Sequence, residues 1–253
     1  MRGFQSLLFS LYLWTVVVSV TAFISTLIIL SFPLAIFDRR RRFAHRLGTL
    51  WGILLLGANP FWHLRIVGSR RIHKDKSYVL VSNHSSLADI VCLFSLDHQF
   101  KWLAKESLFQ IPFLGWAMRV MRYISLERGQ YGSIRKSYQE ALDCLQKNIS
   151  VLIFPEGTRS RTGEMGHFKS GAFRLALESG RPLLPIVLAG TEKIISKGKP
   201  GFGQTRLAYM SILPPLETKG WGAEEEVGLK KKVEIAMRRE LAKRNRMLAR
   251  VHL

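Results

Sequence analysis

The 253-residue sequence predicts an α/β fold: a mixed, largely parallel sheet flanked by helices and preceded by an N-terminal membrane-embedded helical segment. Two observations support this. Short β-branched or aromatic segments alternate with helical ones over about 150 residues after residue 63, a pattern typical of a sheet covered by helices. Before them, residues 3–37 contain no charged side chain. We expect membrane-anchoring helices in residues 1–63, an α/β unit in residues 64–218 and a basic amphipathic helix in residues 219–253.

The composition restricts the class of protein further. Lys and Arg number 38 against 18 Asp and Glu, and this net charge of +20 indicates an anionic partner: nucleic acid, a phosphate-bearing substrate or an acidic membrane. A hydrophobic content of 47% excludes disorder as the main state. Cys92 and Cys144 lie outside any CxxC or Cys/His cluster, so neither a disulfide framework nor a zinc site is indicated and we expect a reducing compartment.

The first apolar run is too long for a single perpendicular helix across a bilayer. As one helix, residues 3–37 would span about 50 Å against a hydrocarbon core of about 30 Å, so the run must tilt, extend into the interface or fold back. It also exceeds a signal-peptide core and lacks a small-residue cleavage site, which predicts retention in the membrane. Four arginines, residues 39–42, follow Asp38, and the positive-inside rule places them in the cytoplasm.

A second uncharged stretch, residues 47–62, is too short to cross a bilayer comfortably. It carries Trp51 and Trp62, and tryptophan favours the headgroup level. We expect an interfacial segment or the second arm of a membrane-embedded hairpin. A buried helix of the α/β unit is the alternative.

The α/β unit begins where the long apolar runs end. Two helices are clear: residues 130–146 carry an apolar face, and residues 169–179 stop at Gly180 ahead of Pro182. In such sheets ligands bind at the carboxyl ends of the strands. The seven predicted strands are residues 64–69, 78–82, 101–104, 123–126, 151–154, 183–188 and 206–212.

The C-terminal segment has the charge pattern of a helix, with acids at its start, residues 224–226, and bases at its end. Its apolar stripe can lie on the α/β unit or on lipid, with the basic side facing anionic headgroups. Nucleic-acid binding would use the same charge, but the sequence has no zinc module or RNP-like aromatic strand, so we do not expect it. The stripe consists of Val233, Met237, Leu241 and Leu248.

The segment SNHSSLAD, residues 82–89, brings a base and an acid together after the strand-like YVLV. His84 and Asp89 are about 140° apart around an ideal helix, so they meet only if His84 lies in the loop and Asp89 in the next helix's first turn. Ser85 or Ser86 could then cap that helix. A carboxylate bonded to one imidazole nitrogen fixes the tautomer and raises the basicity of the other, which makes His84 a candidate general base. The alternative is a structural pair, a loop histidine bonded to a capping aspartate.

The segment FPEGTRSR, residues 154–161, follows the strand-like VLIF. Pro155 and Gly157 favour a turn at the carboxyl end of that strand. Guanidinium groups in such a turn can hold phosphate through bidentate hydrogen bonds. A solvated basic loop is the alternative, and we favour it for Arg161. The turn would present Glu156, Thr158, Arg159 and Arg161, and two further cations, Lys105 and Arg128, end other apparent strands.

Together these residues resemble the phospholipid and glycerol acyltransferase family over residues 64–216. A bare HxxxxD pattern is common, but HxxxxD combined with FPEGTRS at this separation is specific. In one departure, Arg122 stands where the second block of the family usually carries Gly, a difference that concerns the acceptor pocket more than the chemistry. Four elements match in order: NHxxxxD at Asn83, His84 and Asp89, a strand ending in Arg128, FPEGTRS at residues 154–160, and a Pro-Ile-Val strand at residues 185–187.

The resemblance implies a glycerol-phosphate acyltransferase-like fold on the cytoplasmic side of the cell inner membrane. The implied reaction moves a fatty acyl group from acyl carrier protein or coenzyme A to the free hydroxyl of lysophosphatidic acid, giving phosphatidic acid without metal, other cofactor or covalent enzyme intermediate. His84 would take the hydroxyl proton and Asp89 would stabilise the imidazolium. The resemblance assigns the acceptor phosphate and glycerol to Arg128, Glu156, Gly157, Thr158 and Arg159, with Lys105 as a further contact.

Other functions remain open from the sequence. A membrane-bound serine hydrolase could use Ser82, Ser85 or Ser86, although the chain has no GxSxG motif and a serine beside its base is poorly placed for a triad. A membrane-tethered protein that binds acidic lipid or nucleic acid is a third hypothesis. Within the resembled family, glycerol 3-phosphate, other lysophospholipids and lyso-ornithine lipid are alternative acceptors.

Overall fold

The computed structural model describes residues 2–59, 62–195, 198, 201–203 and 207–251. All seven predicted strands are present, with ends shifted by no more than two positions. Residues 60, 61, 206, 252 and 253, which our predicted elements include, lie outside the described residues. The strands are β1 (His63–Val67), β2 (Val79–Ser82), β3 (Phe100–Lys105), β4 (Ile124–Leu126), β5 (Ser150–Ile153), β6 (Leu183–Ala189) and β7 (Leu207–Ile212).

The strands form one seven-stranded sheet in the order β1-β7-β6-β2-β5-β3-β4. Every neighbouring pair is parallel except β6 and β7, which pair antiparallel. β2 lies in the middle, where Val79 pairs with Val151 of β5 on one side and with Leu183 of β6 on the other. The prediction of a mixed, largely parallel sheet is confirmed, and β2 to β6 share one carboxyl edge.

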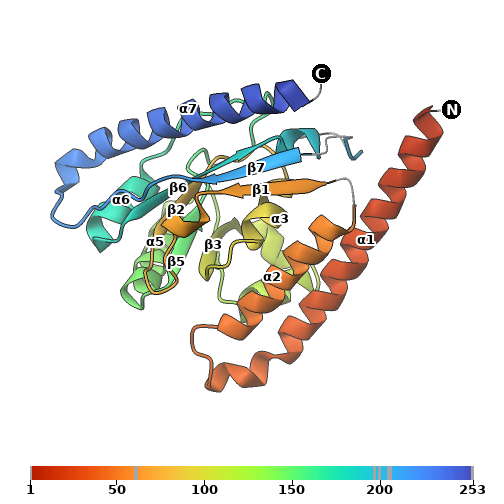
Figure 1. Cartoon of the computed structure of the whole chain (residues 1–253). Coiled ribbons are helices and arrows are strands. Elements are labelled where there is room, and N and C mark those ends of the chain that lie inside the picture. The colour runs from red at the N-terminus through yellow and green to blue at the C-terminus, as the bar shows by residue number, and fades with distance from the viewer. Residues whose placement is uncertain (1, 60–61, 196–197, 199–200, 204–206, 252–253) are drawn as a thin grey trace.

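Successive side chains of the central strands face opposite sides of the sheet, so the sheet has a core on each side. Val79 and Val81 enter one core, and Leu80 between them enters the other. Figure 1 shows α7 along one face of the sheet and the α1–α2 pair on the other. The first core is covered by α5 (Tyr131–Gln146), α6 (Gly171–Ser179) and α7 (Glu226–Val251), the second by α1 (Arg2–Leu30), α2 (Arg42–Gly57), α3 (Ala88–Phe94) and α4 (Leu114–Val120).

The chain reverses direction after the long uncharged run, at the charged segment of residues 38–42. α1 ends at Leu30, a 3₁₀ helix with Pro33 near its start follows, and α2 returns beside α1 as the second arm of a hairpin (Figure 1). Trp51 Nε1 joins the arms by donating to Thr21 Oγ1 at 2.9 Å. Within the described chain, the helical stretch Phe4–Leu30 is long and apolar enough to cross a membrane by length and composition.

α2 also packs on the α/β unit, through two glycines. A Cβ added at Gly48 or Gly52 would lie 2.7 or 2.8 Å from side-chain atoms of Phe94 in α3, so only glycine permits this approach. Another face of α2 stays exposed and apolar, with Phe43 and Ile53 open to the surroundings. The stretch that we expected in the interface or in the α/β unit therefore has one face on the protein and another available to lipid.

The C-terminal helix α7 lies on the sheet through its apolar stripe. Val233 and Met237 are fully buried there, and Leu241 and Leu248 are nearly so. Arg244 is buried beside them, where its guanidinium lies over the ring of Tyr209. Of the two expected placements, the structure has the stripe on the protein, which leaves the basic side of α7 facing outward.

Arg122, the residue that replaces the usual Gly, has a left-handed backbone with φ of +53°. It follows the end of α4, where Tyr123 N donates to Met118 O at 3.0 Å and Arg122 N donates to Arg119 O at 2.9 Å. These two bonds define a Schellman motif, whose left-handed position glycine occupies at least cost. The chain therefore keeps the backbone that glycine would give, with a strained arginine in its place.

Candidate active site

The predicted site segments all leave the sheet at one edge. β2 ends at Ser82, just before His84, and β5 ends at Ile153, just before the FPEGTRSR turn. β3 ends at Lys105, and β4 ends two residues before Arg128. Because these four strands are parallel, their carboxyl ends share an edge, the position at which α/β sheets bind ligands.

His84 and Asp89 meet as the helix geometry requires. His84 lies in the loop after β2 and Asp89 lies in the first turn of α3. His84 Nδ1 is 2.8 Å from Asp89 Oδ2, and their side chains are 13% and 0% exposed. The carboxylate must accept, so Nδ1 carries the proton and Nε2 is the nitrogen that can receive one. The N-cap residue of α3 is Leu87, so neither Ser85 nor Ser86 is the cap, although Ser86 Oγ accepts from Ala88 N at 3.1 Å.

Asp89 is held by more than the histidine. Its Oδ2 also accepts from the backbone N–H groups of Ser85, at 2.7 Å, and Ser86, at 2.8 Å. Three donors on Oδ2 offset part of the cost of burying the charge and fix the carboxylate in place. The ring of His84 is fixed from another direction, because it stacks on Phe154 with 4.0 Å between ring centroids and 10° between planes.

Asn83 fastens the loop that carries His84 to β6. Its side-chain amide donates to Leu188 O at 2.9 Å, and its Oδ1 accepts from Leu188 N at 2.8 Å. This pair of bonds continues the β2–β6 ladder by one residue after β2 has ended. The backbone directly before His84 is therefore held in a fixed position on the sheet.

Glu156 joins the two motifs. Its Oε1 accepts from His84 N and its Oε2 accepts from Gly166 N, both at 2.8 Å, and the residue is 8% exposed. Burial raises the pKa of this carboxyl, while the hydrogen bonds from Gly166 N and His84 N act in the opposite direction. A second bond between the segments runs from Ser160 N to His84 O at 2.8 Å. Both carboxylate oxygens of Glu156 thus face backbone N–H groups of this chain.

Gly157 forms the turn that the sequence predicts, with a left-handed φ of +70°. Pro155 O accepts from Lys169 N at 2.9 Å, which closes the loop. A Cβ at Gly157 would lie 3.2 Å from Cε and Nζ of Lys169, so the ammonium of Lys169 lies beside this turn. Lys169 is a cation of the site that we did not predict.

The remaining predicted residues lie at the same edge, farther from His84. Across the sheet, β3 is two strands from β2 and β4 is three strands from β2. At about 4.8 Å per strand, the strand that ends at Lys105 is about 10 Å from β2, and the strand that precedes Arg128 is about 14 Å from β2. Both side chains are exposed, and so is Thr158 in the FPEGTRSR turn; Arg159 is partly buried. The structure therefore joins His84, Asp89 and Glu156 by hydrogen bonds, with Gly157 in the adjoining turn and the cations farther along the same edge.

The three serines near His84 bond elsewhere. Ser82 Oγ donates to Asn83 O, Ser85 Oγ shares a hydrogen bond with Thr191 Oγ1, and Ser86 Oγ donates to Ile195 O. A nucleophilic serine must instead place its hydroxyl on the imidazole that activates it. This geometry does not support the serine hydrolase hypothesis.

Three residues that hold the site were not predicted: Phe154, Lys169 and Arg238. Phe154 stands in the motif, but nothing in the sequence says that its ring faces His84. Arg238 lies on α7 and donates to Met165 O at 2.7 Å and to Gly166 O at 3.1 Å, so it clamps the loop that supplies Gly166 N to Glu156. An arginine on the basic side of a long helix gives no sequence signal of such a contact.

Comparisons with known proteins agree with this geometry. A 1-acyl-sn-glycerol-3-phosphate acyltransferase of Arabidopsis chloroplasts is 39% identical over 182 residues, which are 71% of this chain and 51% of that protein. One from Borreliella burgdorferi is 32% identical over 52% of this chain and 53% of that protein. This chain thus spans about half the length of these relatives. The crystal structure of PlsC from Thermotoga maritima, the 1-acyl-sn-glycerophosphate acyltransferase, superposes with a TM-score of 0.83 at 28% identity, covering 97% of this chain and 98% of that one.

The Acyltransferase family model matches residues 63–189, half of the chain. Those residues contain β1 to β6, the His84–Asp89 pair, the FPEGTRSR turn, Lys105 and Arg128. The match therefore covers the carboxyl edge described above, and the chain belongs to the Acyltransferase family.

Proposed function

We propose that this protein transfers a fatty acyl group from acyl carrier protein or coenzyme A to the free hydroxyl of 1-acyl-sn-glycerol 3-phosphate, giving phosphatidic acid for phospholipid synthesis. The observation that carries the proposal is the hydrogen-bonded His84–Asp89 pair, which lies at the same carboxyl edge of the sheet as the cations Lys105, Arg128 and Arg159. The names of the relatives support the same reaction. An alternative acceptor within the family, such as another lysophospholipid or lyso-ornithine lipid, would use the same pair.

In the proposed mechanism His84 is the general base. Nε2 takes the proton of the acceptor hydroxyl as its oxygen attacks the thioester carbonyl, while Nδ1–H stays bonded to Asp89 Oδ2. The carbon–sulfur bond then breaks, and the thiolate leaves with the proton that the imidazolium returns. No metal, other cofactor or covalent enzyme intermediate is needed, because the thioester is already activated. General-base assistance supplies about 10²- to 10⁴-fold, so positioning of the two substrates supplies much of the rest.

The cations at the edge hold the acceptor in this mechanism. Arg128 and Arg159 bind the phosphate through guanidinium hydrogen bonds, with Lys105 as a further contact. Gly157 and Thr158 shape the turn against the glycerol. Both oxygens of Glu156 already accept hydrogen bonds from backbone N–H groups. Its proposed role is therefore to join the loop that carries His84 to the phosphate-binding turn.

Membrane attachment follows from the lipid acceptor. We propose that the chain lies in the cell inner membrane with the α/β unit on the cytoplasmic side, because Arg39 to Arg42 follow the uncharged run of residues 3–37 and Asp38. An enzyme seated at the interface meets a lipid acceptor at high effective concentration. The anionic membrane surface and an acidic carrier protein are both attracted to the basic protein, and nucleic acid is not a proposed partner.

One experiment tests the activity. Purified full-length protein in neutral detergent is offered lysophosphatidic acid, glycerol 3-phosphate, other lysophospholipids and lyso-ornithine lipid, each with acyl-CoA and acyl carrier protein donors. We expect phosphatidic acid from lysophosphatidic acid, and a loss of several orders of magnitude in the His84→Ala variant with its thermal unfolding unchanged. Serine-to-alanine variants at 82, 85 and 86 should keep most activity. Formation of a product from a different acceptor alone would replace the proposed substrate, and an active His84→Ala variant would overturn the mechanism.

A further inference from the structure

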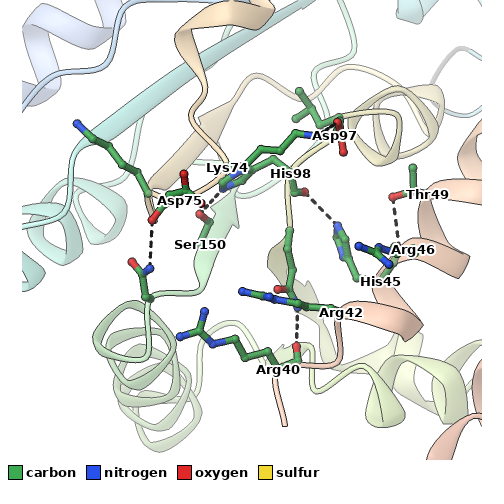
Figure 2. A pocket seen from close by; sticks show the side chains of 14 residues that line it. Arg40, Arg42, His45, Arg46, Thr49, Lys74, Asp75, Asp97, His98 and Ser150 are labelled. Atoms are coloured by element: carbon green, nitrogen blue, oxygen red, sulfur yellow. Dashed lines mark hydrogen bonds and ion pairs between the residues drawn. The ribbon is translucent and has the colours of Figure 1, made fainter. Parts of the chain in front are cut away.

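A cavity of about 620 Å³ lies at the opposite edge of the sheet from His84. Ser150, the first residue of β5, lines it, and so do residues just before β2 and β3. Along β5 the distance from Ser150 to Phe154, which stacks on His84, is about 13 Å at 3.3 Å per residue. The cavity is therefore separate from the proposed acyl-transfer site, and Figure 2 shows the side chains that surround it.

Its lining carries an excess of positive charge. Five cations face two carboxylates, and one of the cations, Lys74, is already paired with Asp97. The other four make no ion pair with any carboxylate in the part of the chain that the structure describes. They are Arg40, Arg42, Arg46 and Lys76.

The two histidines of the lining add no charge near neutral pH. Burial lowers the pKa of His45 to about 3 and that of His98 to about 4. His45 Nε2 bonds to His98 O at 3.1 Å, and His98 Nε2 lies 2.7 Å from Ser150 Oγ. Figure 2 draws these hydrogen bonds as dashed lines. The two histidines therefore form a fixed, neutral side of the cavity, and the positive electrostatic potential inside it comes from the arginines and lysines.

The arginines are placed by the fold. Arg42, His45, Arg46 and Thr49 follow the i, i+3, i+4, i+7 spacing of one face over the first two turns of α2. That face is at the amino end of the helix, where the macrodipole is positive and attracts anions.

Three anchors hold the start of α2 to the α/β unit. Arg41 is 6% exposed, and its guanidinium donates to Ala35 O at 2.6 Å and to Val120 O at 3.2 Å. Gln99 Nε2 and Lys101 Nζ both donate to Arg40 O, at 2.5 and 3.2 Å. These hydrogen bonds hold the backbone that carries Arg40, Arg42 and Arg46 in a fixed position beside the cavity.

We propose that this cavity binds the phosphate group of an anionic phosphoester. Guanidinium groups bind phosphate bidentately, and four unpaired cations around one cavity match a phosphate that carries one or two negative charges. Two sources share this chemistry: the headgroup of an anionic phospholipid and a soluble phosphoester. The strongly exposed Ile36 and Phe37 lie a few residues before the arginines, which would bring the cavity to headgroup level when that apolar segment enters a bilayer.

Binding can be measured without the acyl-transfer reaction. Full-length protein in neutral detergent is mixed with vesicles of phosphatidylcholine alone or with added phosphatidic acid or phosphatidylglycerol, and recovered by flotation. In parallel, glycerol 3-phosphate and inorganic phosphate are titrated by calorimetry. The variants are Arg42→Gln with Arg46→Gln, and separately Lys76→Gln, which lies outside any helix. The matched control is Lys231→Gln with Arg239→Gln, which removes two charges from the exposed side of α7.

We expect the Arg42/Arg46 variant to bind the phosphate-bearing probe about 10- to 100-fold more weakly, since two charge-assisted hydrogen bonds are lost. Lys76→Gln should weaken binding less, and the α7 control should stay within about twofold of the wild type. If the Arg42/Arg46 variant loses binding only to the anionic vesicles, the ligand is a lipid headgroup. If it loses binding to glycerol 3-phosphate, the ligand is a soluble phosphoester. An equal loss in the α7 control, or no binding above phosphatidylcholine and buffer, overturns the proposal, whereas loss of acyl transfer alone bears only on the proposed function.

Discussion

The backbone N–H of His84 donates a 2.8 Å hydrogen bond to Oε1 of Glu156, although the two residues are 72 positions apart. Since the other carboxylate oxygen accepts from Gly166 N, one side chain fixes both the loop that carries His84 and the turn proposed to hold phosphate. The proposed base and the proposed phosphate-binding turn are therefore coupled through a single buried carboxylate.

Glu156→Gln should lower kcat by about 10- to 100-fold. The amide has one oxygen and one NH₂ group, so it can accept only one of the two N–H groups and leaves the other buried and unpaired, at a cost of about 1–3 kcal/mol. Steady-state kinetics with saturating acceptor measures this directly. Glu178→Gln, whose carboxylate is on α6 and accepts from Tyr138, is the matched control. Unchanged kcat in Glu156→Gln would show that the carboxylate does not hold the loop.

Asp89→Asn should reduce kcat by about 10²- to 10⁴-fold with little change in KM. The amide keeps the volume but no longer holds the proton on Nδ1 of His84, so the wrong tautomer competes. Kinetics of the variant beside Asp143→Asn, an exposed aspartate on α5, separates this effect from a general loss of negative charge. Near-normal kinetics of the Asp89→Asn variant would argue for the purely structural His84–Asp89 pair that the sequence left open.

Arg238→Gln should lower kcat/KM by up to about tenfold, because the loop that presents Gly166 N to Glu156 loses two hydrogen bonds to its carbonyl groups. Assays well below the unfolding temperature, with kcat and KM resolved, distinguish positioning from stability. The neighbouring exposed Arg239→Gln serves as control. If both variants behave alike, α7 does not position the site.

Arg122→Gly should raise stability by about 1 kcal/mol, because the left-handed position after α4 costs an arginine about that much and a glycine much less. Burial lowers the pKa of Arg41 and the like charge of Arg122 lowers it further, so the substitution also removes a repulsion on Arg41. For a chain of this size we expect the unfolding temperature to rise by about 2–4 °C. Asn148→Gly at the equivalent position after α5 should gain less, since asparagine tolerates this conformation. A drop in unfolding temperature on Arg122→Gly would show that its side chain makes compensating contacts.

Stability should fall in acid because two buried histidines resist protonation. Burial lowers the pKa of His45 to about 3 and of His98 to about 4, against 6.5 for an ordinary histidine. The unfolded chain therefore binds more protons below pH 6.5, so the stabilisation is complete above that pH and is lost toward pH 4, by at most about 1.4 kcal/mol per pH unit per histidine. Denaturant unfolding from pH 7.5 to 4.5 should show a shallower slope for His45→Gln. An identical slope would mean that His45 titrates normally.

The sequence predicted the fold because each level of pattern agreed. The β-branched segments marked all seven strands, and the angle between His84 and Asp89 on a helix required the loop-to-helix arrangement that the structure has. The order of the strands in the sheet could not be predicted from the sequence. β2 pairs with strands that lie more than 70 residues away along the chain, and no local pattern encodes which strands pair.

The same limit explains what was missed in the site. The family resemblance assigned Glu156 to the acceptor phosphate and glycerol, whereas its two carboxylate oxygens accept hydrogen bonds from the backbone N–H groups of His84 and Gly166. Lys169 and Arg238 approach the turn only through tertiary packing. The basic cavity likewise combines residues from α2 and from the segments before β2, β3 and β5, so the arginines after Asp38 signalled only membrane orientation.

Ile24 and Ile28 of α1 and Ala44 of α2 belong to the same core as Leu80 of the central strand. Cutting the chain after the hairpin would therefore uncover a sheet face as well as remove the proposed membrane anchor. Assays of the proposed activity consequently call for the intact polypeptide, hairpin included.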